Sequence, residues 1–135
     1  DRLGIVALRG IGILERIAGA GADRSGGAGV YETYPGGSLA KWGLRSTGYK
    51  DPAATDERRE IVEALAAHVD LAGTAPQLIA NDDDLDAVIT AVVTGLAWMG
   101  LTTSAPPEHH DVARVEGWIH VPQRPIDSLP NLRQD

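Results

Sequence analysis

Residues 82–99 carry the feature that most constrains the fold, which is a continuous amphipathic helix pattern. Apolar side chains recur every three or four residues, at Leu85, Val88, Ile89, Val92, Leu96 and Met99. This period is typical of a helix that buries one face. Asn81 or Asp82 is expected to cap its N-terminus, because a short polar side chain there accepts hydrogen bonds from the first backbone N–H groups. Such a helix needs other elements to cover its apolar face.

The rest of the chain alternates between helical and extended patterns. Further helices are expected over residues 3–18, 38–44 and 55–68. Strands are expected over residues 30–34, 76–80 and 115–121, and a turn over 35–37. The Gly-rich segment 19–29 is expected to be a flexible connection, because no phosphate-loop Lys-Ser/Thr pair follows its glycines. This order indicates an α/β fold, with one domain over residues 1–122 and a Pro-containing tail over 123–135.

Composition excludes several classes of protein. The chain has no Cys, so it forms neither a disulfide framework nor a thiolate metal site, which fits a reducing cytoplasm. No stretch approaches the roughly 20 apolar residues of a membrane span, and the N-terminus lacks the pattern of a signal peptide. We therefore expect a soluble, cytoplasmic protein with no membrane partner.

The net charge of −7 counts against tight, non-specific binding to nucleic acid. Part of this charge is local, however, since Asp82, Asp83, Asp84 and Asp86 sit together. Such a cluster is partly neutralised when it holds divalent cations. The objection to a nucleic-acid substrate is weakened but not removed.

Asp83 and Asp86 are candidates for a shared site, because residues three apart on a helix project only about 60° from each other. That face flanks the apolar stripe, so both carboxylates are expected at the rim of the core. The alternative is an acidic first turn that stabilises the helix dipole.

Glu32 is expected between two large residues on one face of the strand over 30–34. Its alternatives are an edge-strand charge or an ion pair with Lys41, Lys50, Arg58 or Arg59.

A set of short motifs follows in a fixed order. These are Tyr31-Glu32-Thr33-Tyr34-Pro35, Lys41-Trp42-Gly43-Leu44, Tyr49-Lys50, Asp83-Asp84-Leu85-Asp86-Ala87 and Glu116-Gly117-Trp118-Ile119-His120-Val121-Pro122. Together they resemble the uncharacterised family numbered 429 among domains of unknown function, whose members are described as predicted nucleases of RNase H fold. The Asp83-x-x-Asp86-Ala87 pattern is also similar to the closing catalytic helix of RuvC-type resolvases.

The resemblance implies an RNase H-like mixed sheet flanked by helices, and a divalent-metal-dependent nuclease that hydrolyses phosphodiester bonds of nucleic acid. Glu32, Asp83 and Asp86 would be the catalytic metal ligands, since Mg²⁺ and Mn²⁺ prefer oxygen donors. Lys50, Arg58 and Arg59 would contact substrate phosphates.

One departure from the superfamily pattern affects this expectation. The superfamily opens with a three-strand unit whose first strand carries an essential aspartate, and no such unit precedes the opening helix here. Either the chain is the C-terminal part of a longer protein of this fold, or the family pattern is truncated and the chain is not an active nuclease on its own. In both cases an exposed sheet edge is expected to pair with the missing half or a second copy. Two other functions stay open. They are a non-catalytic scaffold whose acidic cluster binds a basic partner, and a small-molecule phosphohydrolase.

Overall fold

The structure is a computed structural model that describes residues 2–130 and 132, with side chains from Gly10 onward. The described residues form two compact units, each built from two stretches of chain. One unit comprises the described residues of Asp1–Glu32 together with Ser104–Ile119. The other comprises Thr33–Thr103 and the described residues of His120–Asp135. The single domain over residues 1–122 stays a prediction.

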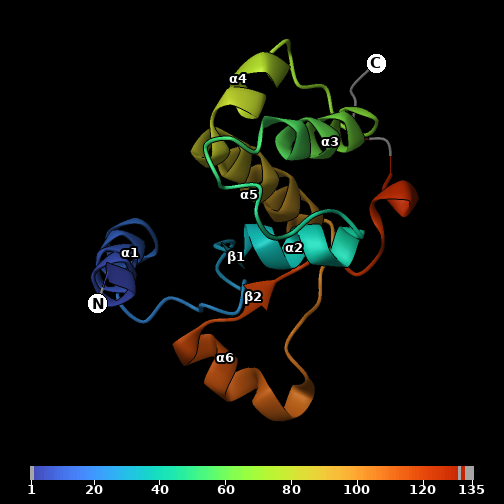
Figure 1. Ribbon diagram of the computed structural model, residues 1–135. Helices are drawn as coiled ribbons and strands as arrows, with labels where there is room; N and C mark the ends of the chain where they lie inside the picture. Colours follow the sequence, from blue (N-terminus) through green and yellow to red (C-terminus); the bar gives the residue numbers. More distant parts are fainter. Residues whose placement is uncertain (1, 131, 133–135) are drawn as a thin grey trace. The chain divides into compact units, whose positions relative to one another are not determined.

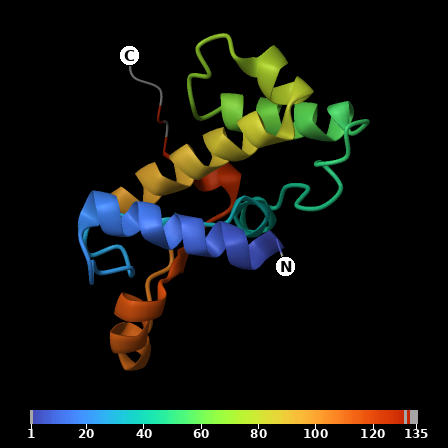
Figure 2. The same ribbon diagram turned by 90° about the vertical axis from the view of Figure 1, so that its left-hand side faces the viewer.

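The larger unit is a helical assembly around α5 (Asp82–Trp98), and Figures 1 and 2 show α3 (Thr55–Ala66) and α4 (Ala75–Ala80) alongside it. Helix α2 (Pro35–Trp42) also packs on α5. Leu85, Ile89 and Leu96 of α5 are fully buried, as the helix pattern predicts. Met99, the last residue of the expected stripe, follows the end of α5 and is 46% exposed. They meet Leu39 of α2 and Leu65 of α3 in one apolar core.

The N-terminus of α5 is capped as predicted. Asn81 has extended backbone geometry, and its side-chain oxygen accepts hydrogen bonds from the N–H groups of Asp83 at 2.9 Å and Asp84 at 3.4 Å. This satisfies two N–H groups that lack a partner within the helix. The first turn of α5, and with it the acidic cluster, is therefore fixed by a local interaction.

The strand expected over residues 76–80 is wrong, and the strand expected over 115–121 is confirmed only at Ile119–His120. Residues 76–80 belong to helix α4, in which Pro76 lies in the first turn, where proline is accepted, and Leu78 is buried. Residues 115 and 116 end helix α6 (His110–Glu116), which follows a 3-10 turn, η1 (Pro107–His109). Short apolar runs do not distinguish a strand from a buried helical turn by periodicity alone.

The expected turn at 35–37 is also wrong, and so is the expected start of the next helix at residue 38. Helix α2 begins at Pro35, and Ser38 lies inside it with a fully buried side chain. The helix ends at Trp42 and is capped by Gly43, whose φ of 77° lies in the left-handed region that glycine adopts without strain. The Pro-Gly-Gly run therefore starts a helix, because proline suits its first position.

Extended structure is sparse among the described residues. Strand β1 (Glu32–Thr33) and strand β2 (Ile119–His120) pair as a two-stranded parallel sheet. Thr102 and Pro122 add an isolated antiparallel bridge. The protein is therefore of mixed α/β class, with more helix than strand.

The smaller unit contains α1 (Arg2–Ala18), the predicted opening helix, and α6, with the glycine-containing connection between α1 and β1. The backbone N–H of Arg24 donates to the carbonyl of Arg114 at 3.0 Å, and the N–H of Trp118 donates to the carbonyl of Arg24 at 3.3 Å. The connection that was expected to be flexible is thus tied to the α6 segment at Arg24. No helix within the described part of the chain is long and apolar enough to cross a membrane.

The expected tail contributes to the core of the larger unit. Ile126, in the short 3-10 helix η2 (Ile126–Ser128), is 5% exposed. The N–H of Leu132 donates to the carbonyl of His68 at 2.8 Å. Residues 131 and 133–135 of the expected tail lie outside the described residues.

Candidate functional site

Asp86 is the centre of a polar cluster in the larger unit. The loop between α2 and α3 supplies Tyr49 and Lys50, and the second turn of α5 supplies Asp86. The hydroxyl of Tyr49 donates to Oδ1 of Asp86 at 2.7 Å, and the ammonium of Lys50 donates to Oδ2 at 2.5 Å. Both carboxylate oxygens are therefore held, one by a neutral donor and one by a cation.

Burial differs across this cluster. Tyr49 is 1% exposed, whereas the side chains of Asp86 and Lys50 are 19% and 58% exposed. The Lys50 ammonium also lies 5.7 Å from the centre of the Tyr49 ring. The tyrosine is thus a fixed part of the core, while the lysine reaches the carboxylate from the solvent side.

The electrostatics follow from this arrangement. Burial, followed by the hydrogen bond to Asp86, raises the pKa of Tyr49 far above its usual value. The hydrogen bond to Asp86 raises the pKa of Lys50, and the charges of Asp86, Asp82 and Asp83 act in the same direction. One ammonium group is therefore stabilised by three carboxylates from the first two turns of α5.

Asp82 and Asp84 are partly buried, like Asp86. Asp83 is exposed, unlike Asp86, so the expectation that both lie at the rim of the core is correct for Asp86 alone. Asp84 accepts a hydrogen bond from Nε2 of Gln77 at 2.9 Å. Within the described residues, no three His, Asp or Glu side chains lie together in a group that could hold a metal ion as they stand.

The predicted phosphate-binding residues have different surroundings. Arg58 is 1% exposed, and its guanidinium donates to the backbone carbonyls of Ile79, Tyr49, Asp51 and Pro52. It therefore connects the loop before α3 to the end of α4. The side chain of Arg59 is 52% exposed and lies 3.9 Å from a carboxylate oxygen of Asp56.

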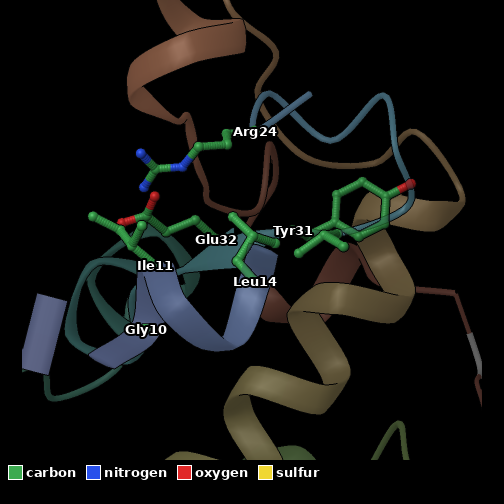
Figure 3. Close-up of a pocket in the computed structure, with 7 residues that line it drawn as sticks. Gly10, Ile11, Leu14, Arg24, Tyr31 and Glu32 are labelled. Atoms are coloured by element: carbon green, nitrogen blue, oxygen red, sulfur yellow. The ribbon is translucent and has the colours of Figure 1, made fainter. Parts of the chain in front are cut away.

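Glu32 lies in the smaller unit, whereas Asp83 and Asp86 lie in the larger one. A pocket of about 300 Å³ in the smaller unit is lined partly by Glu32 and Arg24. Figure 3 shows the carboxylate of Glu32 and the guanidinium of Arg24 facing each other. Sequence reasoning missed Arg24, because a single arginine in a Gly-rich segment gives no pattern signal.

Gly117 makes room for this carboxylate. Its φ of 102° is one that glycine adopts readily, and an added Cβ would lie 2.6 Å from Oε2 of Glu32 and 3.6 Å from Nη2 of Arg24. The glycine of the Glu116-Gly117-Trp118 motif therefore permits close approach of Glu32 to the backbone. The motif was noted in the sequence, but this contact was not predicted.

Fold and site together define a mixed α/β protein with more helix than strand, in which a buried tyrosine and an exposed lysine hold one carboxylate of an acidic helix start. The chain belongs to the family DUF429, described as a protein of unknown function, whose model matches residues 5–111. No curated protein and no solved structure matches the chain.

Proposed function

We propose that this protein is a divalent-metal-dependent nuclease of RNase H-like fold that hydrolyses phosphodiester bonds. One observation carries the proposal. A part-buried carboxylate, Asp86, is oriented by a buried tyrosine and binds a cationic group that Asp82 and Asp83 also stabilise. This is an environment in which a cation is favoured, although the cation present is the ammonium of Lys50.

The donor chemistry fits a hard cation, because the cluster offers carboxylate oxygens and no sulfur. Asp86 and Asp83 would hold the ion. A bound Mg²⁺ or Mn²⁺ would supply an activated water and would stabilise the charge that develops on the leaving oxygen. Because no ready three-residue group is present among the described side chains, binding requires the Lys50 ammonium to leave Oδ2 of Asp86.

The remaining residues of the cluster have separate tasks in this proposal. Tyr49 keeps Oδ1 of Asp86 in place from within the core. Lys50, once it leaves Asp86, has an exposed ammonium that can contact a substrate phosphate, and Arg59 is exposed enough to do the same. Arg58 is left out, because its donors are used by backbone carbonyls in the core.

Calorimetric titration with Mg²⁺ and Mn²⁺ tests the proposal. We expect Asp86→Asn to weaken metal binding at least tenfold, since it removes a charged ligand but keeps the shape of the side chain. Asp56→Asn is the matched control, because the Asp56 side chain is 92% exposed and lies outside the cluster. Equal metal affinity of Asp86→Asn and the wild type would remove the proposed site.

Cleavage assays then separate the possible substrates. A short labelled oligonucleotide, single-stranded or double-stranded, should be cleaved in the presence of metal and spared by Asp86→Asn. Hydrolysis of a nucleotide phosphate alone would instead indicate a small-molecule phosphohydrolase. Absence of both metal binding and hydrolysis would contradict the proposal and leave a scaffold with an acidic partner-binding cluster.

A further inference from the structure

The pocket of the smaller unit combines an apolar wall with two opposite charges. Ile11 and Leu14 of α1 and Val30 supply apolar lining, while Arg24 and Glu32 supply the charged part. Figure 3 shows these last two side chains with their polar ends toward each other. A volume of about 300 Å³ lies at the lower end of the range for small-molecule sites.

Arg24 is held firmly enough to serve as part of a binding site. Both of its backbone groups are hydrogen-bonded to the segment around α6, and its Nη1 donates to the carbonyl of Val115 at 3.2 Å. Its Nη2 lies near the space beside Gly117 that Oε2 of Glu32 also borders. A rigid donor and an acceptor therefore share one small region.

This charge pattern selects the chemistry of the ligand. An anion attracted to Arg24 would be repelled by Glu32, and a cation attracted to Glu32 would be repelled by Arg24. A neutral group that carries an acceptor next to a donor satisfies both side chains. A ring that presents a carbonyl beside an N–H has such an edge, and its flat faces suit an apolar wall.

We infer that this pocket binds a planar heterocycle through a lactam edge, with the carbonyl oxygen accepting from Arg24 and the adjacent N–H donating to Glu32. Uracil and guanine present this edge, and a base outside a helix is commonly read through the same edge. The inference does not depend on the metal site at Asp86. It gives Glu32 a role in ligand binding, in place of the metal-ligand role that the family resemblance implies.

Uridine and 3-methyluridine are the probes, titrated into the intact chain and followed by NMR or calorimetry. Uridine should bind, and methylation of its ring N–H should weaken binding about tenfold or more, because Glu32 then loses its donor partner. A short oligouridylate offers the same edge, so comparing it with the nucleoside shows whether the natural source is a polymer or a free molecule.

Variants assign the two contacts. Glu32→Ala and Arg24→Ala should each weaken uridine binding about tenfold or more. Glu15→Ala is the control. It removes one carboxylate, as Glu32→Ala does, but Glu15 lies in α1 outside the lining of this pocket. Circular dichroism would establish that the variants are folded. Since Arg24 also has a structural hydrogen bond, Glu32→Ala decides the result if Arg24→Ala unfolds.

Three outcomes would overturn the inference. They are no binding of uridine at millimolar concentration, equal binding of uridine and its methylated form, and binding that Glu32→Ala leaves unchanged. Metal titration of Glu32→Ala separates this result from the proposed function. Loss of metal binding in that variant would place Glu32 in the metal site and contradict the role inferred here.

Discussion

Tyr49 illustrates how one side chain serves both the core and the candidate site. Its ring is buried, and its hydroxyl donates to a carboxylate that faces outward. A hydrogen bond to a charged group contributes more to stability than a neutral one, about 1.5–3 kcal/mol. The same contact opposes ionisation of the phenol, because a tyrosinate would face Asp86 without a proton between them.

The pH dependence of Tyr49→Phe tests this assignment. A raised pKa means that the contribution of Tyr49 is fully present below the ordinary tyrosine pKa of about 10 and is lost as the pH rises toward the folded-state value. Near pH 7 the variant should be about 1.5–3 kcal/mol less stable. Urea unfolding at pH 7 and pH 11 should show this difference shrinking.

Absorbance of tyrosinate during alkaline titration provides the second readout. The wild type should show a late step, well above pH 10, that is absent from Tyr49→Phe. The assignment would be contradicted if the stability difference between the wild type and Tyr49→Phe stayed constant with pH and both proteins gave the same alkaline titration. The pKa of Tyr49 would then not be raised by burial and Asp86.

At the scale of elements, the sequence predicted those features of the helices that depend on interactions between residues close together in the chain. The start of α5 was predictable because Asn81 acts on the next three residues, and the buried stripe was predictable from its period. The strand expected over residues 76–80 was wrong because helix α4, with six residues, is too short for a helical period to show in the sequence. Pro76 is compatible with a helical first turn as well as with a break.

Asn81→Ala should weaken the folded state through α5 alone. Loss of the cap leaves the N–H groups of Asp83 and Asp84 without their side-chain acceptor, at a cost of about 1 kcal/mol. Urea unfolding measures the change. Asn81→Ser should recover most of the loss, because a hydroxyl also caps. If alanine and serine destabilise equally, the side-chain cap is not what holds the first turn.

At the scale of the whole molecule, the candidate site was only partly predictable. Asp86 and Lys50 were both singled out, but their direct pairing depends on a loop and a helix that lie 36 residues apart in sequence. Periodicity carries no information about such contacts. Burial of Arg58 was missed because it depends on carbonyls of the loop before α3 and of Ile79, and the sequence does not distinguish Arg58 from the adjacent, exposed Arg59.

The segment from residue 123 onward also makes contacts that the sequence pattern did not predict. Its prolines indicated a tail, whereas Ile126 packs in the core. Ile126 is 5% exposed within the core of the larger unit, so Ile126→Ala should cost about 2–4 kcal/mol by leaving a cavity. Asp127→Ala, at the exposed neighbouring position, should change the free energy of unfolding by less than about 0.5 kcal/mol. Urea unfolding of both variants compares them directly. Equal stabilities would mean that the segment does not pack on the core, and the helices of the larger unit would then fold without it.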